Sequence, residues 1–382
     1  MSKFPIKLDK RLQKRKEENS LRRLDFFSEG VDFFSNDYLG LSKSEKIYDS
    51  ANTLIASSEL KNGATGSRLL SGNHIFYKEL EDLLADFHEA EAALVFNSGY
   101  DANIGFFSAV PQKSDIILFD ELSHASIRDG LQLSLARNYK FRHNDMQHLE
   151  ELLKKFSKQN SEIYIVTESV FSMDGDSPDL LKLGKLAERF NARLVLDEAH
   201  ATGVFGKKGE GLSQGMIKNC FARIYTFGKA IGCHGAAILG SRELKEYLVN
   251  FSRSLIYTTA LSPHAVATVI SAYRFLDSPQ GLSEIQKLRE NISFFTQKLK
   301  EFQLDSFFIS ANSAIQSCIL SGNDEVKSVA SEIAKNGFLV KPILSPTVPK
   351  GKERLRFCLH SYNSHQEISE VLSLLANFVV KN

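Results

Sequence analysis

The stretch Ile224-Tyr225-Thr226-Phe227-Gly228-Lys229-Ala230 is the most informative part of this 382-residue sequence. Its first four residues are β-branched or aromatic, which is typical of a buried strand. A lysine follows, with Gly228 before it and Gly232 three residues after it. Because burial lowers the pKa of an amine, a lysine at the end of such a strand can act as a nucleophile that forms a Schiff base. The alternative, more common for a lysine taken alone, is a surface residue whose stem covers apolar neighbours.

Similar apolar runs precede this one along the chain. They are residues 92–96, 115–119, 163–167 and 194–196. A predicted helix at 101–110 and amphipathic stretches such as 146–156 and 180–190 lie between them. Apolar strands that alternate with helices indicate an α/β fold with a mainly parallel sheet covered on both faces. In such a sheet ligands bind at the edge where the strands end. The polar residues that follow each run are therefore the candidate functional residues.

Polar residues suited to chemistry do follow these runs. The turn Ser98-Gly99-Tyr100 precedes a helix whose first N–H groups could hold a phosphate. Asp197 ends a buried run and either caps the next turn or keeps a pyridine nitrogen protonated, which makes the ring an electron sink. His124 and Ser172 lie in loops after two further runs, where each alone could be an ordinary loop residue. Their convergence on one rim of the sheet favours a shared site.

The two ends of the chain have a different character. Residues 10–23 are heavily charged and predict an exposed N-terminal helix. After a predicted helix at 263–276, apolar runs at 314–320, 338–343 and 355–359 alternate with helices at 325–335 and 366–378. This pattern indicates a second, smaller α/β domain with some antiparallel strands. We expect an N-terminal helical segment at 1–41, a large cofactor-binding domain at 42–275 and a small C-terminal domain at 276–382.

The composition excludes several classes of protein. A formal net charge of +1 gives no sign of the basic excess that is typical of nucleic-acid-binding proteins. No stretch approaches the roughly 18 to 20 apolar residues that span a bilayer, so we expect no membrane association and a cytoplasmic location. The four cysteines lie far apart, with no pair at metal-ligand spacing. We expect reduced thiols and no metal site, and Cys233 near Lys229 is interpreted as a packed small hydrophobe.

Taken together, the motifs resemble the α-oxoamine synthases. These are fold type I pyridoxal phosphate (PLP) enzymes that condense an amino acid with an acyl thioester, and the resemblance implies a large domain with a mainly parallel sheet plus a smaller C-terminal domain. The matching segments are residues 34–41, 66–72, 98–100, 122–126, 168–176, 197–203 and 226–229. The resemblance covers almost the whole chain, and the combination is specific although each segment alone is not.

The resemblance implies a set of cofactor contacts. Lys229 would carry PLP as a Schiff base and later shuttle a proton, Asp197 would pair with the pyridinium nitrogen, and His124 would stack on the ring. The remaining contacts would be Gly99, Tyr100 and Thr226 at the phosphate, and Ser172 and His200 near the phenolic oxygen.

The resemblance also implies substrate contacts. Arg356 would bind the amino-acid carboxylate, a task that suits a bidentate guanidinium, and Arg22 and Thr347 would contact substrate. The C-terminal runs 313–316, 346–349 and 354–356 resemble the members that join L-alanine to a pimeloyl thioester in biotin biosynthesis, with coenzyme A or a carrier protein as the acyl carrier. One departure is Leu344, since those members often have an arginine here that would contact the distal carboxylate of the acyl chain.

Other functions remain open at this point. Sister enzymes share the lysine motif, so 2-amino-3-ketobutyrate CoA ligase (glycine C-acetyltransferase) and serine palmitoyltransferase are alternatives. A transaminase on the same fold would need no thioester, and a non-enzymatic protein would not need Lys229, Asp197 and His124 together. The resemblance further implies a homodimer.

Overall fold

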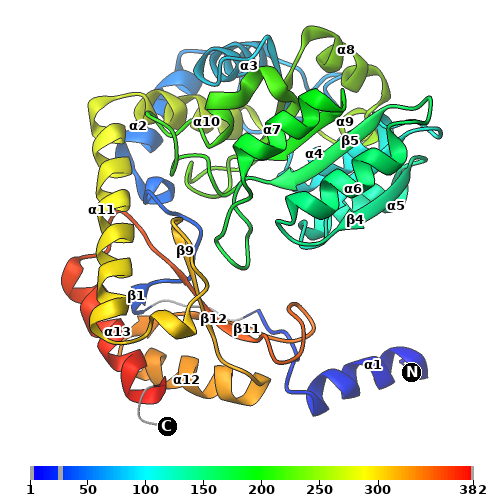
Figure 1. Cartoon of the computed structure of the whole chain (residues 1–382). Coiled ribbons are helices and arrows are strands. Elements are labelled where there is room, and N and C mark those ends of the chain that lie inside the picture. The colour runs from blue at the N-terminus through cyan, green and yellow to red at the C-terminus, as the bar shows by residue number, and fades with distance from the viewer. Residues whose placement is uncertain (1–3, 25–28, 380–382) are drawn as a thin grey trace. The chain divides into compact units, whose positions relative to one another are not determined.

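The structure, a computed structural model, describes residues 4–24 and 29–379. Its contacts divide into two compact units, drawn together in Figure 1. The larger unit comprises Asn36–Ser172 and Asp176–Lys287, and the smaller comprises Met1–Ser35, Met173–Gly175 and Leu288–Asn382. The predicted domain limits at 41 and 275 differ from this division. The boundary between Lys287 and Leu288 lies inside the long helix α11 (Pro279–Glu301). The boundary predicted from the sequence lies before this helix, at residue 275.

The larger unit is built on a seven-stranded sheet in the order β2-β8-β7-β6-β5-β3-β4. Its strands are β2 (Ala92–Phe96), β3 (Ile116–Asp120), β4 (Arg137–Phe141), β5 (Ile163–Glu168), β6 (Arg193–Asp197), β7 (Cys220–Thr226) and β8 (Ala236–Gly240). Only β8 is antiparallel to its neighbours, which are β2 and β7. The mainly parallel sheet predicted from the sequence is thereby confirmed.

Helices cover both faces of this sheet. They are α2 (Glu45–Ala56), α3 (Ile75–Phe87), α4 (Gly99–Ala109), α5 (Ala125–Leu133), α6 (Met146–Phe156), α7 (Leu180–Arg189), α8 (Arg242–Phe251), α9 (Arg253–Ile256) and α10 (Pro263–Leu276), with 3-10 turns η1 (Leu41–Lys43) and η2 (Ser213–Asn219). The predicted helices at 146–156 and 263–276 have these bounds in the structure. Helix α10 packs against α2 and α3.

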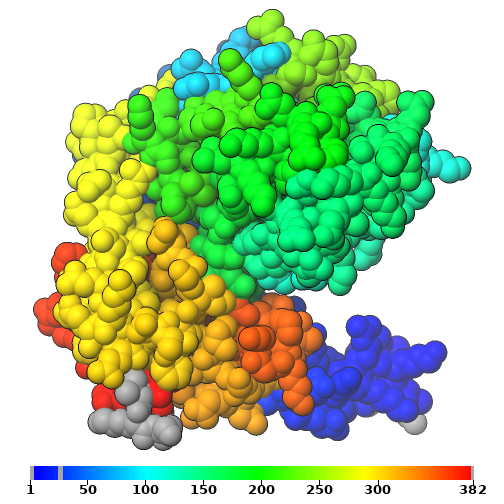
Figure 2. Space-filling model, in the orientation of Figure 1, coloured from blue at the N-terminus to red at the C-terminus, as the bar shows by residue number. Residues whose placement is uncertain are grey.

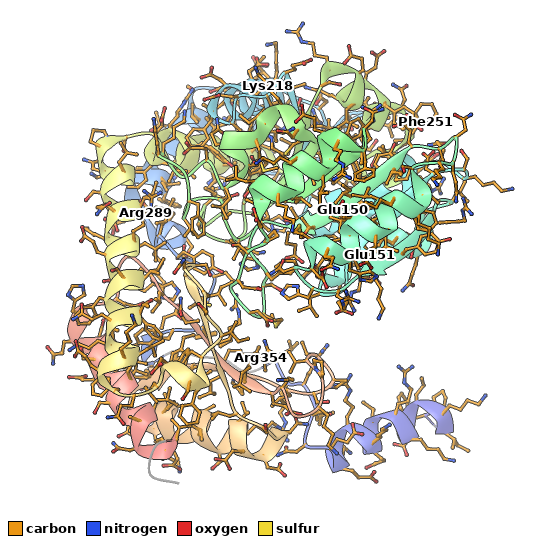
Figure 3. All side chains as sticks on the ribbon, in the orientation of Figure 1. Glu150, Glu151, Lys218, Phe251, Arg289 and Arg354 are labelled. Carbon is orange, nitrogen blue, oxygen red and sulfur yellow. The ribbon has the colours of Figure 1, made fainter. Side chains whose placement is uncertain are left out.

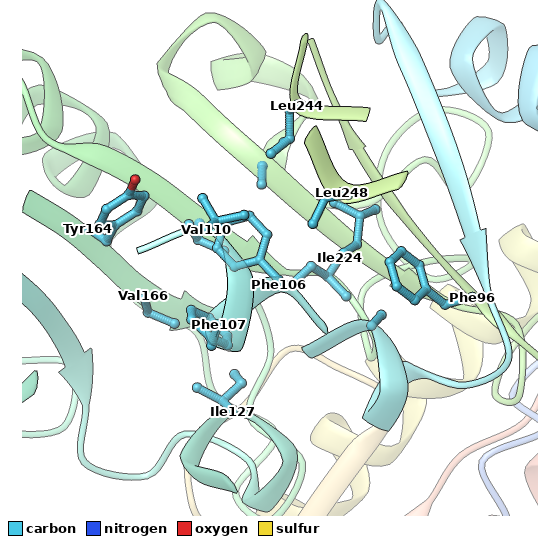
Figure 4. Packing of buried hydrophobic residues seen from close by; sticks show 14 of the residues in the cluster. Phe96, Phe106, Phe107, Val110, Ile127, Tyr164, Val166, Ile224, Leu244 and Leu248 are labelled. Carbon is cyan, nitrogen blue, oxygen red and sulfur yellow. The ribbon is translucent and has the colours of Figure 1, made fainter. Parts of the chain in front are cut away.

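Side chains that alternate along the strands pack into two separate hydrophobic clusters, one on each face of the sheet. Ile117 and Val166 point to the face covered by α4, α5 and α8, where Phe106 and Phe107 pack (Figure 4). Neighbouring residues such as Ile165 point to the other face, against α6 and α7. Both faces of the sheet are therefore buried, which holds the strand ends in fixed positions.

The smaller unit contains short strands and flanking helices. A three-stranded antiparallel sheet has the order β11-β12-β9, and β1 pairs with β10 in parallel. The elements are α1 (Ile6–Glu17), β1 (Val31–Asp32), η3 (Asp305–Phe307), β9 (Ile315–Ile319), α12 (Asn323–Lys335), β10 (Phe338–Leu339), β11 (Lys341–Ile343), β12 (Arg354–Cys358) and α13 (His365–Val379). Antiparallel strands were expected here, and they are confirmed. Helix α1 buries none of its residues, as predicted for an exposed N-terminal helix, although it begins and ends earlier than expected.

The outer helices of the larger unit carry ordinary surface charge. Glu150 on α6 pairs with Lys154 of the same helix at 2.8 Å and with Arg189 of α7 at 3.0 Å (Figure 3). Within residues 4–24 and 29–379, no helix combines the length and the apolar character needed to span a membrane.

Candidate active site

The site is assembled where the parallel strands of the larger unit end. Because β8 reverses direction between β2 and β7, those two strands run the same way as β6, β5 and β3. Register pairs Glu168 with Asp197 at the ends of β5 and β6, and Thr226 with Ala236 beside the end of β7. The sequence prediction of one shared rim is confirmed for these strand ends.

Lys229 lies in a tight turn that follows β7. The turn is closed by the N–H of Gly232 donating to the Lys229 carbonyl at 2.8 Å and that of Cys233 donating to the Phe227 carbonyl at 2.7 Å. Gly232 has φ +66°, and a Cβ there would lie 2.2 Å from the Ser42 nitrogen. Glycine is therefore required at 232 for backbone conformation and close packing, a different reason from the extra room that the sequence suggested. Burial raises the pKa of the Cys233 thiol to about 12, which fits a packed, unreactive side chain.

A directional chain of hydrogen bonds connects Asp197 to His124. The Asp197 carboxylate, 6% exposed, accepts the Ala199 N–H at 2.9 Å through one oxygen and the Asn103 amide at 3.0 Å through the other. The same amide group donates to the Ser126 hydroxyl at 3.1 Å. That hydroxyl lies 2.8 Å from Nδ1 of His124. The chain fixes the acid and the imidazole relative to each other.

The surroundings of His124 favour the neutral form of its ring. Burial lowers its pKa and the Lys229 charge lowers it further, while the Asp197 carboxylate opposes both. Its Nδ1 accepts the backbone N–H of Ser126 at 3.2 Å, which favours the tautomer that is protonated at Nε2. A neutral aromatic ring at this position suits stacking on another ring. The mutual electrostatic influence also shows that Lys229, Asp197 and His124 share one neighbourhood, as predicted.

Glu168 is a buried acid of the site that the sequence analysis did not single out. Burial raises its pKa to about 8 and the Asp197 carboxylate reinforces this, whereas the Lys229 charge and the His124 N–H bond oppose it. The His124 backbone N–H donates to its carboxylate at 2.6 Å. The available signal was its position at the end of the apolar run 163–167, equivalent to that of Asp197 after 194–196.

The residues predicted to hold a phosphate lie together. Helix α4 begins at Gly99, directly after the turn that ends β2, and the hydroxyl of Ser98 caps it by accepting the Asp101 N–H at 3.1 Å. A Cβ on Gly99 would lie 3.6 Å from the Thr226 hydroxyl, so this helix start and the end of β7 are adjacent. The first N–H groups of a helix have no partner within it and attract anions. Tyr100 is exposed, and its hydroxyl donates to the Asp129 carboxylate.

His200 is buried, and its Nδ1 lies 2.7 Å from the hydroxyl of Tyr38. Tyr38 is fully buried in the segment after β1, within one of the runs that carried the family resemblance. Ser172 lies in the loop after β5 and is partly buried. The N–H of the preceding Phe171 donates to the Asp176 carbonyl at 3.0 Å, which closes this loop.

A charged histidine anchors the same loop. His143 donates through Nδ1 to Asp120 at 2.9 Å and through Nε2 to Asp176 at 2.8 Å. Burial alone would lower its pKa, but the two carboxylates outweigh this and raise it to about 10. We call His143, Asp120 and Asp176 the imidazolium clamp. It ties the end of β3 to the loop that carries Ser172, and the sequence analysis missed it.

The predicted substrate residues belong to the smaller unit. Nη2 of Arg22 donates to the hydroxyl of Thr347 at 3.3 Å, so the structure brings these two together. Arg356 on β12 is 5% exposed, and its guanidinium donates to the Cys358 sulfur at 2.9 Å. Leu344 is partly buried, and its carbonyl accepts the Thr347 N–H at 2.9 Å.

The donor set of the larger unit fits PLP. A buried carboxylate suits a protonated ring nitrogen, a neutral imidazole suits a ring face, and a helix N-terminus beside a hydroxyl suits a phosphate. The amine of Lys229 is partly buried near both the acid and the imidazole.

Comparison with known proteins agrees with this geometry. Residues 28–375 match the family described as aminotransferase class I and II. The chain is 38% identical to the 8-amino-7-oxononanoate synthase of Emericella nidulans, over 96% of this chain and 94% of that protein. It is 38% identical to a putative enzyme of the same name from Methanococcus vannielii, over 97% and 99% of the two chains.

Solved structures show the same relationship. Serine palmitoyltransferase from Sphingomonas wittichii superposes with a TM-score of 0.88 and 26% identity, covering 100% of this chain and 98% of that one. The 8-amino-7-oxononanoate synthase from Francisella tularensis gives a TM-score of 0.78 and 28% identity, over 92% and 98%. The chain therefore belongs to the class I and II aminotransferase family, and within it to the α-oxoamine synthases, as a PLP-dependent acyl-transferring enzyme.

Proposed function

We propose that this enzyme condenses L-alanine with a pimeloyl thioester, with loss of carbon dioxide and of the free thiol, to give 8-amino-7-oxononanoate. The observation that carries the proposal is identity of 35–40% over most of the chain to relatives of that name. The placement of Lys229, Asp197 and His124 at one sheet edge supports it, because a carbon nucleophile needs a base, a charge-stabilising acid and a ring support together.

The cofactor would be held by residues from five strand ends and loops. Lys229 would provide the attachment amine, Asp197 would face the ring nitrogen and His124 would cover one face of the ring. The phosphate would lie against Gly99, Tyr100 and Thr226, and the phenolic oxygen near Ser172 and His200. When bound, PLP supplies an electron sink for the α-carbon of the amino acid.

The protein's own groups would then manage protons and charge. Nζ of Lys229 would accept the α-proton of the amino acid and later return a proton to the product, which requires a neutral amine at that moment. Asn103 and the Ala199 N–H would keep the Asp197 carboxylate oriented. Glu168, with a pKa near 8, can hold a proton at neutral pH, which avoids two adjacent buried carboxylate charges.

Substrate selection would depend on the smaller unit. Arg356 would bind the carboxylate that every candidate amino acid carries, and Arg22 and Thr347 would contact substrate. Because Leu344 replaces a possible cation, we expect acyl recognition to depend on chain length more than on the terminal charge. The acyl carrier would be coenzyme A or a carrier protein, and the functional form a homodimer in the cytoplasm.

A substrate panel tests the proposal. L-Alanine, glycine and L-serine are each combined with pimeloyl, acetyl and palmitoyl thioesters, thiol release is followed, and products are identified by mass spectrometry. The proposed function predicts the highest kcat/KM for alanine with pimeloyl thioester. A preference for serine with palmitoyl thioester would instead assign the sphingolipid-type reaction, an alternative that the TM-score of 0.88–0.89 to serine palmitoyltransferases favours. Amino-group transfer without thiol release would assign transamination.

A further inference from the structure

A cavity of about 770 Å³ lies within the smaller unit, beside helix α1. One wall is the face of α1 that carries Arg11, Lys14 and Arg15, and the other walls are the segments 321–323 and 345–353. Figure 2 shows α1 in blue at the surface, together with the orange segment near residue 345. The volume falls in the range of about 300 to 1,000 Å³ that is usual for small-molecule sites.

Hydrogen bonds fix the walls of this cavity. The Asn323 amide donates to the Glu18 carbonyl at 2.9 Å, and the same side chain accepts the Ser345 N–H at 3.0 Å. Lys327 donates to the Asn19 side chain at 2.6 Å. The end of α1, the start of α12 and the segment after β11 are thus joined, so the cavity does not depend on a loose helix.

Hydrogen bonds also join the wall segments 321–323 and 345–353 to each other. One oxygen of Glu353 accepts the N–H of Gly322 at 2.9 Å and of Gly351 at 2.8 Å, and the Ser321 hydroxyl donates to the Gly351 carbonyl at 3.1 Å. Burial alone would raise the pKa of the Glu353 carboxyl, but the backbone N–H bonds together outweigh it and lower the pKa. Its charge is therefore largely engaged with backbone donors of the wall.

The remaining lining charge is mostly positive. Arg11, Lys14, Arg15 and Lys350 line the cavity, against Glu18 and Glu353. Lys14 is 3.7 Å from Glu18, a long and exposed pair. Four cations around one cavity is a strong concentration in a chain whose net charge is +1. Such a lining suits an anion with several charges, above all phosphate groups.

The cavity also adjoins the predicted substrate contacts. Pro346, which lines it, directly precedes Thr347, whose hydroxyl accepts the Arg22 hydrogen bond at 3.3 Å. A ligand in the cavity would therefore end close to the residues expected to meet the acyl substrate.

We propose that this cavity binds the adenosine 3′,5′-bisphosphate end of an acyl-coenzyme A. The inference rests on the proposed function, since a thioester donor is what gives the enzyme a phosphorylated substrate. Phosphate groups meet the basic face of α1 and Lys350, and the thioester end extends toward Arg22 and Thr347.

Binding of adenosine 3′,5′-bisphosphate itself, measured by calorimetry at low ionic strength, tests the site directly. Arg15→Glu and Lys350→Glu should each raise Kd by roughly tenfold, as expected for reversing one partly exposed charge that contacts phosphate. Lys16→Glu, on the same helix but outside the cavity lining, makes the same charge change and should alter Kd by less than about twofold. Since α1 buries no residue, these variants should keep wild-type circular dichroism spectra.

The outcomes separate this inference from the proposed function. The cavity assignment would be overturned if the wild type bound no adenosine 3′,5′-bisphosphate, or if Arg15→Glu and Lys16→Glu lost the same amount of affinity for it. In turnover, Arg15→Glu should raise KM for pimeloyl-coenzyme A roughly tenfold more than KM for the phosphate-free pimeloyl-pantetheine thioester. An equal change for both thioesters would also refute the site. If the wild type turned over neither thioester, the proposed function would fail, and bisphosphate binding would still decide the cavity. An effect of Arg15→Glu confined to a carrier-protein thioester would assign the surface to that protein instead.

Discussion

Replacing His143 by glutamine would remove the positive charge that the carboxylates of Asp120 and Asp176 hold between them, near the strand ends that form the candidate active site. Asp120 is fully buried, and the side chain of His143 is 21% exposed. The ring also packs edge-on against Phe171, with centroids 4.5 Å apart. The variant therefore leaves Asp120 and Asp176 close together without the charge that separates them.

The pH dependence follows from the direction of the pKa shift. The pKa of His143 rises from the usual 6.5 to about 10 in the folded protein. A raised folded-state pKa stabilises the fold fully below about pH 6.5, and this contribution is lost as the pH rises toward 10. The full shift would correspond to almost 5 kcal/mol, at about 1.4 kcal/mol for each pKa unit. After discounting for the partial exposure of the ring, we expect about 2 to 4 kcal/mol.

Urea unfolding followed by circular dichroism measures this effect. His143→Gln should lower the free energy of unfolding by about 2 to 4 kcal/mol near pH 6.5, and by less than about 1 kcal/mol near pH 10. The control is His148→Gln on α6, whose ring accepts the Arg142 N–H at 3.0 Å. Its effect should not follow the same pH course. A loss in His143→Gln that is equal at both pH values would refute the charged clamp.

Four further predictions concern the site. Asp197→Asn should still bind PLP but lose about 10²- to 10³-fold in kcat, because an amide cannot stabilise a positive ring nitrogen; cofactor titration and steady-state kinetics check both, and undiminished kcat would contradict the role. Asn103→Ala removes a 2% exposed donor shared by Asp197 and Ser126. We expect kcat to fall roughly tenfold and the free energy of unfolding to fall by about 1 to 3 kcal/mol; an unchanged kcat would show that catalysis does not need the hydrogen-bond chain. Arg356→Ala should weaken alanine binding by up to about 2 to 5 kcal/mol, read from KM, and a change confined to the acyl donor would reassign it. With Leu344 present, pimeloyl thioester and its terminal methyl ester should react within about tenfold of each other, and a hundredfold preference for the charged donor would mean that another cation contacts the carboxylate.

Continuous apolar patterning was enough to predict most of the sheet. The run 92–96 coincides with β2, and the runs that became β3, β5, β6 and β7 were located within a few residues. β4 was missed because its sequence, Arg137–Phe141, is mostly polar at an edge of the sheet. β8 was missed because Ala236–Gly240 is rich in small residues, and its burial depends on pairing with β2 and β7 and on packing against α4 and α8.

The site was predictable where a residue ends an apolar run, as with Asp197 and Lys229. Asn103 was not, because it lies inside α4, where a polar residue looks like part of a solvent-facing surface. Only packing shows that its side chain is buried against Asp197 and Ser126. The imidazolium clamp joins residues 33 positions apart in sequence through His143 and Asp176, a contact that no local pattern encodes.

The attachment of the cofactor to Lys229 is the central claim, and covalent trapping tests it most directly. The purified enzyme is incubated with PLP, reduced with borohydride, digested and mapped by mass spectrometry. The Lys229→Ala variant, treated in the same way, is the control, and the exposed Lys218 is the internal reference for non-specific labelling. The account predicts a pyridoxyl group on the peptide that contains Lys229 and none on that peptide in Lys229→Ala, whose turnover is also lost. Labelling of another lysine with the Lys229 peptide unmodified, or near-normal product formation by Lys229→Ala, would contradict it.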